Sequence, residues 1–231
     1  MRLDKLLSNA SNLTRSQAVK AIRQGDVLVD GEIVTKGAEK VTEENQVTYL
    51  GVPISEPKPR YYMLNKPIDC VSANKDKNSL TVFDYLTVPR RDQLHVAGRL
   101  DKDTTGLILA TDDGQWSHRL TSPKHEHTKC YRVTLSDEIT RDAIQQLEQG
   151  LMLEGEKKPT KPAVVHVLEP NLIQLDITEG RYHQVKRMVE AVANEVIGLH
   201  RESIAHIKLD SALALGHWRQ LTAQEIDLSK G

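Results

Sequence analysis

The stretch Gly98-Arg99-Leu100-Asp101-Lys102-Asp103-Thr104-Thr105-Gly106-Leu107 decides how the central part of the chain is interpreted. It joins two apolar segments, 94–97 and 107–110, that have the length and composition of short strands. A glycine at each end and the charged residues between them predict a loop that connects two strands. Such a loop commonly displays catalytic groups, although a polar turn with a local arginine–aspartate pair is the more frequent interpretation of the stretch taken alone.

Outward from this loop, strands and helices alternate irregularly between residues 60 and 231. The predicted strands cover 61–64, 94–97, 107–111, 129–135, 163–168, 172–177 and 196–200. The predicted helices cover 115–120, 139–149 and 182–193. Because the helices are too few and too unevenly placed for a regular series of parallel βαβ units, this order predicts an α+β fold with a mixed, mostly antiparallel sheet flanked by helices.

Residues 1–50 have the pattern of a separate small unit. Leucines at helical spacing predict one helix close to the N-terminus. Thr14 and Gln17 form a capping-box pattern at the start of a second helix, which Gly25 is expected to end. The pair Asp30-Gly31 then predicts the turn of a β-hairpin, and a further strand is expected near residues 46–50.

A proline-rich segment follows this unit. Residues 52–59 contain three prolines and few apolar side chains, which predicts a semi-rigid linker. We therefore expect two domains, residues 1–59, which include the linker, and residues 60–231.

Charge and composition limit the classes of function. The net charge of −1 argues against binding of polyanions through bulk charge, so contact with a nucleic acid needs a local patch. The N-terminal unit offers one basic face, although charge alone is equally typical of a solvated helix. Its candidate RNA-binding residues are Arg2, Lys5, Arg15, Ser16, Lys20 and Arg23.

The remaining composition favours a globular protein of the cytoplasm. Charged residues make up 27% of the chain and hydrophobic residues 39%. The charged start, residues 1–5, does not resemble a signal peptide, and no apolar run is long enough for a membrane span. Cys70 and Cys130 match no disulfide or metal spacing, and the histidines near Cys130 match no zinc pattern, so no metal site is expected.

The motifs of both regions resemble known families. Residues 1–50 are similar to the S4-like RNA-binding module, which implies that the basic face contacts structured RNA. The stretch 98–109 resembles the catalytic motif of the pseudouridine synthases. Three further segments fit the same family in order: Tyr62-Met63-Leu64-Asn65-Lys66-Pro67, Lys129-Cys130-Tyr131-Arg132-Val133 and Glu179-Gly180-Arg181-Tyr182-His183-Gln184-Val185-Lys186-Arg187-Met188.

This resemblance implies roles for individual side chains. Asp101 is implied as the nucleophile, and Tyr131 as the aromatic that stacks on the uracil and moves a proton from C5. Lys186 is implied as the cation that keeps Asp101 ionised, with Arg187 as the alternative partner. The implied RNA contacts of this region are Arg99 and Arg181, with a wider track of Arg119, Lys124, Lys129 and Arg201.

Asp103 lies close enough to Asp101 to suggest paired carboxylates. A hydrolytic pair admits water, whereas an isomerase must exclude it, so we interpret Asp103 as a residue that shapes the loop. The implied reaction moves the glycosidic bond of uridine from N1 to C5 without gain or loss of atoms, and therefore implies no cofactor. Whether Asp101 attacks C1′ or C6, or takes a proton from C2′, stays open.

Features after the catalytic motif, residues 112–119, resemble the small-ribosomal-subunit branch of the family. This implies 16S ribosomal RNA as the partner, with uridine 516 as the modified position, either as free RNA or in an assembly intermediate of the subunit. We expect a monomer that does not bind membranes. The alternatives are a synthase for 23S ribosomal RNA, a non-catalytic RNA-binding assembly factor, and an N-glycosidase that releases the base.

Overall fold

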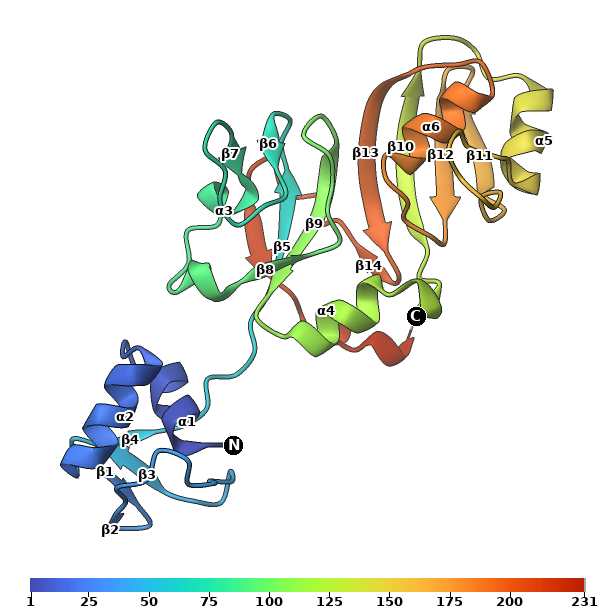
Figure 1. The fold of residues 1–231 in the computed structure, drawn as a ribbon. Coiled ribbons are helices and arrows are strands. Elements are labelled where there is room, and N and C mark those ends of the chain that lie inside the picture. Colours follow the sequence, from blue (N-terminus) through green and yellow to red (C-terminus); the bar gives the residue numbers. More distant parts are fainter. Residues whose placement is uncertain (231) are drawn as a thin grey trace. The chain divides into compact units, whose positions relative to one another are not determined.

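The structure is a computed structural model that describes residues 1–230 (Figure 1). The chain divides into two compact units, Met1–Lys58 and the remainder from Pro59 onward. Within the described residues, no helix combines the length and the apolar character that crossing a membrane requires.

Two helices open the N-terminal unit, α1 (Leu3–Ala10) and α2 (Arg15–Gln24). The predicted capping box at the start of α2 is confirmed. The backbone N–H of Gln17 donates to Thr14 Oγ1 at 3.3 Å, and the Gln17 side chain accepts from the Thr14 N–H at 2.8 Å. Gly25 ends the helix in the left-handed conformation with a φ of 83°, as its lack of a side chain allows.

A four-stranded antiparallel sheet completes the N-terminal unit, in the order β2-β1-β3-β4. Its strands are β1 (Val27–Val29), β2 (Glu32–Ile33), β3 (Val47–Tyr49) and β4 (Val52–Ile54). The predicted hairpin turn is present at Asp30-Gly31, where both residues have positive φ. The linker prediction was wrong for residues 52–54, because they form β4. Proline is compatible with this strand since β4 lies at the sheet edge.

The second unit is built on one large sheet of nine strands, in the order β11-β12-β10-β13-β9-β5-β15, with β14 paired to β13 and β8 to β9. The strands are β5 (Tyr61–Lys66), β8 (His95–Ala97), β9 (Thr105–Thr111), β10 (Lys129–Leu135), β11 (Val164–Glu169), β12 (Leu172–Ile177), β13 (Val196–Ile204), β14 (Ile207–Lys208) and β15 (Trp218–Gln220). A small separate pair is formed by β6 (Cys70–Val71) and β7 (Leu80–Thr81). The α+β fold with a mixed, mostly antiparallel sheet is thus confirmed.

The helices of this unit surround the sheet. They are α3 (Val82–Tyr85), α4 (Gly114–Thr121), α5 (Arg141–Gln149), α6 (Gln184–Ala191) and α7 (Ala223–Ile226), with short 3-10 turns η1 (Arg91–Gln93), η2 (Pro123–His125) and η3 (Leu228–Lys230). Helix α6 packs on β10 and β12 through Val185, Met188 and Val189, which belong to the same apolar cluster as Val133 and Leu175 (Figure 1). This packing holds the start of α6 beside the sheet face that carries Tyr131.

Strands β9 and β13 form the parallel join of the large sheet, through the pairs His200–Thr105 and Arg201–Gly106. Gly106 has a φ of 103°, and a Cβ at this position would collide with the backbone of Arg201. The glycine that ends the 98–107 loop is therefore required by the close approach of two strands. The join fixes the loop against β13.

The predicted helix 182–193 starts two residues later than expected, at Gln184. His183 has a positive φ of 46°, so Tyr182 and His183 form a turn that leads into α6. The spacing of apolar residues does not predict such a turn, because the turn depends on the backbone angle of a single residue. The predicted helix 139–149 likewise starts at Arg141, with Thr140 as its N-cap.

Candidate active site

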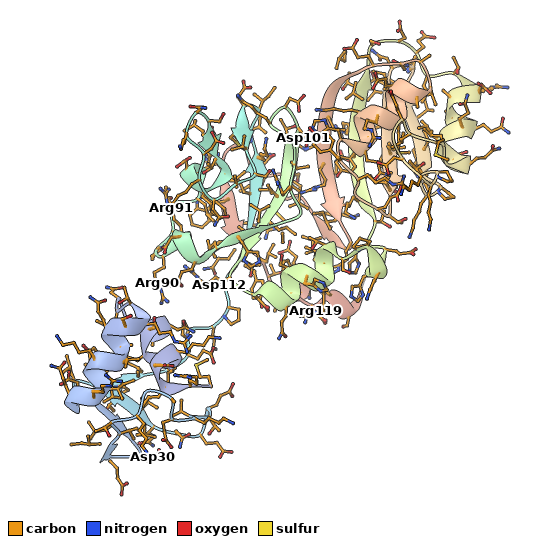
Figure 2. All side chains as sticks on the ribbon, in the orientation of Figure 1. Asp30, Arg90, Arg91, Asp101, Asp112 and Arg119 are labelled. Carbon is orange, nitrogen blue, oxygen red and sulfur yellow. The ribbon has the colours of Figure 1, made fainter. Side chains whose placement is uncertain are left out.

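The 98–107 loop, the turn before α6 and the adjoining strands enclose a cavity of about 560 Å³. Asp101 lies in the loop between β8 and β9 (Figure 2). The structure brings the three predicted catalytic residues Asp101, Tyr131 and Lys186 to the wall of this one cavity. The apolar part of the wall consists of Val96, Leu100, Ile177, Val185 and Leu199. The rest of the wall includes polar and charged side chains, and a cavity that combines apolar surface with convergent polar groups can bind a small organic moiety.

Asp101 is accessible and loosely paired. Its side chain is 35% exposed, Lys186 Nζ lies 3.7 Å from Oδ2, and His183 Nε2 lies 3.5 Å from Oδ1. Both distances exceed those of a short charge-assisted hydrogen bond. The carboxylate therefore has a cation nearby, as predicted for Lys186, while its oxygens stay available to a ligand.

Lys186 is closer to the second carboxylate of the loop. Its Nζ donates to Asp103 Oδ1 at 2.6 Å, and this hydrogen bond is the main reason that the pKa of Asp103 is lowered. The sequence analysis treated Asp103 only as a loop-shaping residue. The contact adds a second role, because Asp103 determines where the lysine is held.

Two fully buried cations support the backbone of the loop from below. Lys66 Nζ donates to the carbonyls of Lys102 at 3.1 Å and Thr104 at 2.7 Å, and burial lowers its pKa. The Arg201 guanidinium donates to the carbonyls of Gly98 at 2.7 Å, Arg99 at 3.3 Å and Leu107 at 2.7 Å. The predicted RNA contact of Arg201 is wrong, because the side chain is buried and bonded to the loop.

Ser72 also supports the loop, whereas the hydroxyl of Thr104 is left without a partner among the residues that the structure describes. The hydroxyl of Ser72 donates to the carbonyl of Leu100 at 2.6 Å and accepts from the Leu100 N–H at 3.0 Å. Thr104 is buried on the cavity wall, and its hydroxyl has no hydrogen-bond partner within residues 1–230. A buried hydroxyl without a hydrogen-bond partner costs free energy, and a bound molecule that supplies a partner would remove this cost. Lys66 and Ser72 lie outside the sequence-based set of site residues, and Arg201 entered it only as an RNA contact, since nothing local marks a lysine or arginine as buried.

Tyr131 lies on β10, between Lys129 and Leu135, with its side chain facing the cavity and only 8% exposed. It is paired across the strands with Arg201, which places it directly beside the join that carries the loop. A buried aromatic on the wall can present a ring face to a planar ligand.

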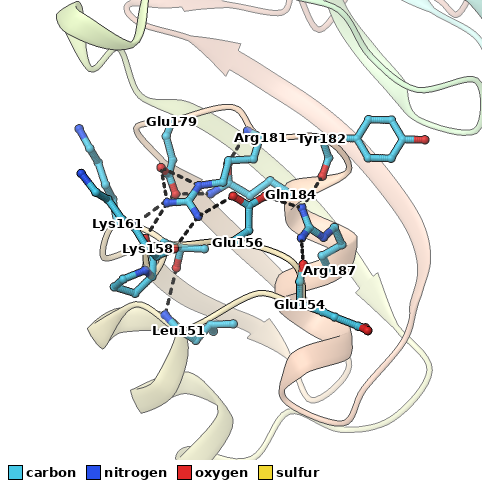
Figure 3. Close-up of polar contacts among 12 residues, drawn as sticks. Leu151, Glu154, Glu156, Lys158, Lys161, Glu179, Arg181, Tyr182, Gln184 and Arg187 are labelled. Carbon is cyan, nitrogen blue, oxygen red and sulfur yellow. Dashed lines mark hydrogen bonds and ion pairs between the residues drawn. The ribbon is translucent and has the colours of Figure 1, made fainter.

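The turn before α6 is held by the polar network that Figure 3 draws. The Arg181 N–H donates to Gln184 Oε1 at 2.8 Å, and its guanidinium donates to the carbonyls of Lys158 at 2.8 Å and Pro159 at 2.6 Å. The Arg187 guanidinium pairs with Glu156 at 3.0 Å. Because Arg187 is paired with Glu156, Lys186 is favoured as the partner of Asp101. Arg181 has a structural role, and its contact with RNA stays a prediction.

Arg99 differs from these arginines. Its side chain is exposed on the rim of the cavity and forms no hydrogen bond or ion pair within the part of the chain that the structure describes. The alternative interpretation, a local arginine–aspartate salt bridge, is therefore absent from the structure of residues 1–230. A free guanidinium beside the cavity can bind a phosphate.

The basic face of the N-terminal unit is exposed on α1 and α2 and just before α1. All six predicted RNA-binding side chains are solvent-exposed: Arg2, Lys5, Arg15, Ser16, Lys20 and Arg23. Arg2 and Arg15 contact the buried Asp4 at 2.7 and 3.3 Å and remain half-exposed. The face can therefore contact a polyanion, which stays a prediction for each residue.

Both units of the chain match known protein families. A family model described as RNA pseudouridylate synthase matches residues 60–191, and an S4 domain model matches residues 1–47. The chain is 48% identical over 230 residues to a Haemophilus influenzae protein named ribosomal small subunit pseudouridine synthase A, with 98% of each chain covered. It is 50% identical over 227 residues to the Escherichia coli protein of the same name, again with 98% of each covered.

One solved structure is similar over nearly the whole chain. It is described as a crystal structure of pseudouridylate synthase, with 47% sequence identity, a TM-score of 0.72 and coverage of 98% of both chains. Sequence and fold therefore lead to the same family from two independent comparisons.

Proposed function

The chain belongs to the RNA pseudouridylate synthase family and carries an N-terminal S4 domain, and from this premise we propose that it isomerises a uridine of 16S ribosomal RNA to pseudouridine. We further propose position 516 as the target, the cytoplasm as the location and a monomer as the active form. The single observation that carries the proposal is the accessible Asp101 carboxylate on the wall of a cavity that it shares with Tyr131 and Lys186.

The reaction breaks the bond between C1′ and N1 of uridine, turns the uracil, and forms a bond between C1′ and C5. In the proposed mechanism, the Asp101 carboxylate forms a transient covalent bond with the nucleotide as the bond between C1′ and N1 breaks, and this bond breaks again by the time C1′ is joined to C5. Lys186 Nζ lies 3.7 Å from the carboxylate, so its positive charge offsets the negative charge of Asp101 at the wall of the cavity.

The detached uracil must be held while it turns. The apolar side chains of the wall can pack against the base, and Tyr131 offers its ring for stacking. After the new bond forms, the proton on C5 must leave, and we assign its transfer to Tyr131: the phenol oxygen accepts it while the hydroxyl proton passes to solvent, and N1 takes up a proton from solvent. Entry of the uridine requires extrusion from the RNA stack, which costs a few kcal/mol. Arg99 offers a free guanidinium for an adjacent phosphate.

The test is isotope release from a 16S fragment that carries tritium at uridine C5. We expect tritium release without free uracil, because the hydrogen at C5 is lost while the base stays attached. Asp101→Asn should abolish release and leave RNA affinity within about tenfold, since the residue is assigned to chemistry and not to docking. Asp92→Asn is the matched control, because Asp92 is exposed and its side chain has no partner within residues 1–230.

Each other outcome identifies an alternative. Free uracil would indicate an N-glycosidase, and intact binding without either product would indicate a non-catalytic binder. Release from a 23S fragment alone would reassign the substrate. Equal turnover in Asp101→Asn would overturn the assignment of the nucleophile. Comparing the free fragment with a small-subunit assembly intermediate shows which of the two forms is modified faster.

A further inference from the structure

An exposed aromatic ring stands at the rim of the cavity. The Tyr182 side chain is 76% exposed, the largest fraction among the large hydrophobic side chains that the structure describes, and it lines the cavity mouth. In Figure 3 its ring points away from the polar network around Arg181. A single exposed aromatic is common on protein surfaces, so the position of Tyr182 needs further support before it carries a function.

The backbone that carries Tyr182 is held firmly. The Tyr182 carbonyl accepts from Arg187 Nη1 at 3.2 Å, and the preceding N–H of Arg181 donates to Gln184 Oε1 at 2.8 Å. His183 adopts a left-handed conformation, which is unfavourable for a residue with a side chain. Such a conformation persists only where surrounding contacts determine it, so the exposed ring is presented by an ordered turn.

One face of the Tyr182 ring is covered. The His183 ring stacks on it with centroids 3.8 Å apart and an angle of 20° between the planes. His183 Nε2 in turn lies 3.5 Å from Asp101 Oδ1. The two rings therefore form a short stack that leads from the rim of the cavity to the proposed nucleophile, and the outer face of Tyr182 is free within residues 1–230.

We propose that the outer face of Tyr182 is a subsite for an unpaired nucleobase, the neighbour of the target uridine in the RNA. This inference rests on the proposed function. When a uridine leaves the RNA stack, the adjacent base loses one stacking partner, and an aromatic ring at the cavity mouth can replace it. Arg99, on the same rim, supplies the positive charge for the backbone of that nucleotide.

Steady-state kinetics of tritium release test the subsite. Tyr182→Ala should raise KM for the RNA by roughly 5- to 150-fold, the range of one base–aromatic stack, and change kcat by less than about threefold. Tyr182→Phe should stay within about twofold of the wild type, because it keeps the ring. Tyr182→Leu, which is apolar but has no ring, should resemble the alanine variant. A KM within twofold for Tyr182→Ala, or a leucine variant equal to phenylalanine, would overturn the proposal.

A mononucleotide separates this subsite from the uracil pocket. Uridine 5′-monophosphate has no neighbouring base, so its inhibition constant should be the same in the wild type and in Tyr182→Ala. A parallel rise in that constant would place Tyr182 in the pocket itself and overturn the subsite. An effect seen only with protein-bound subunits, and not with bare RNA, would indicate a protein partner instead.

The matched control is Ile197→Ala, which removes an exposed apolar side chain from β13 outside the cavity and should leave KM within twofold. Failure of the proposed function is recognised separately, because the wild-type protein would then release no tritium from any of the RNA fragments.

Discussion

The tetrapeptide Arg-Leu-Asp-Lys occurs twice in this chain, at residues 2–5 and at residues 99–102, with opposite outcomes for its aspartate. In the first copy Asp4 lies in helix α1, is 2% exposed, and accepts from Arg2 at 2.7 Å and Arg15 at 3.3 Å. In the second copy Asp101 lies in a loop, is 35% exposed, and has Lys186 Nζ at 3.7 Å and the His183 ring at 3.5 Å.

The difference separates a structural carboxylate from one available for chemistry. The hydrogen bond from Arg2 is the main reason that the pKa of Asp4 is lowered, and both of its oxygens are occupied. Asp101 keeps a cation close enough to favour its charge but too far to occupy its oxygens. The arginine of each copy follows the same division, because Arg2 is paired with Asp4 whereas Arg99 has no partner within residues 1–230.

The largest effect short of changing Asp101 itself is expected from removing the cation beside it. Lys186→Met should lower kcat roughly 100-fold, because the carboxylate nucleophile loses the positive charge 3.7 Å away. Lys186→Arg should retain activity within about tenfold, since it keeps the charge. Tritium release checks both variants, and a methionine variant within threefold of the wild type would contradict the ion-pair role.

An intermediate effect is expected from changing Asp4, the aspartate of the first Arg-Leu-Asp-Lys copy. Asp4→Asn should destabilise the N-terminal unit by about 1–2 kcal/mol, a modest value because Arg2 and Arg15 stay half-exposed and can be solvated. Hydrogen exchange of the α1 and α2 amides in the full chain measures this loss. The kcat at saturating RNA should be unchanged, and a matching loss of kcat would show that the first copy is not purely structural.

Lowering the pH should destabilise the N-terminal unit of the wild-type protein in the same way. The pKa of folded Asp4 lies below its ordinary value of 3.8, so its charge stabilises the fold fully above that value. This contribution is lost as the pH falls through the folded-state pKa. The Asp4→Asn variant should lack this part of the pH dependence, and an identical acid transition in both proteins would assign it to other groups.

The smallest effect is expected from Asp103→Asn. The change removes the 2.6 Å partner of Lys186, which can then pair directly with Asp101 and make it resemble Asp4. The kcat should fall by less than about tenfold, because the positive charge beside the nucleophile is kept while its position changes. Asp103→Glu should restore kcat, since it keeps a carboxylate for Lys186. In a Lys186→Met background, Asp103→Asn should change kcat no further, and an equal fall there would leave Asp103 with a loop-shaping role alone.

Local features of the fold were predictable because their causes are local. The capping box at Thr14 and the hairpin turn at Asp30-Gly31 depend on neighbouring residues and are confirmed. The start of α6 was misplaced because His183 takes a left-handed conformation that the network of Arg181 and Arg187 stabilises from outside the segment. Pro53 suggested a linker, yet pairing with β3 makes its segment an edge strand.

The residues of the candidate site likewise include some that the sequence identified and some that it did not. Asp101, Tyr131 and Lys186 could be chosen from motifs, since each belongs to a short recognisable stretch, and the structure gathers them at one cavity. Lys66 was not chosen and Arg201 was given the wrong role of an RNA contact, because a lysine or arginine is normally exposed. Their burial beneath the loop follows from distant strands that meet there.

Most of the larger strands and helices, the family motifs and the two Arg-Leu-Asp-Lys copies could be identified from the sequence, because periodicity, capping and turn chemistry act over a few residues. The folded arrangement was needed to show which copy holds a structural aspartate and which an accessible one. The parallel join of β9 to β13, made possible by Gly106, and the packing of α6 bring Lys186 to Asp101, whereas two arginines close around Asp4. Identical residues differ in function here because long-range packing sets their exposure and their partners.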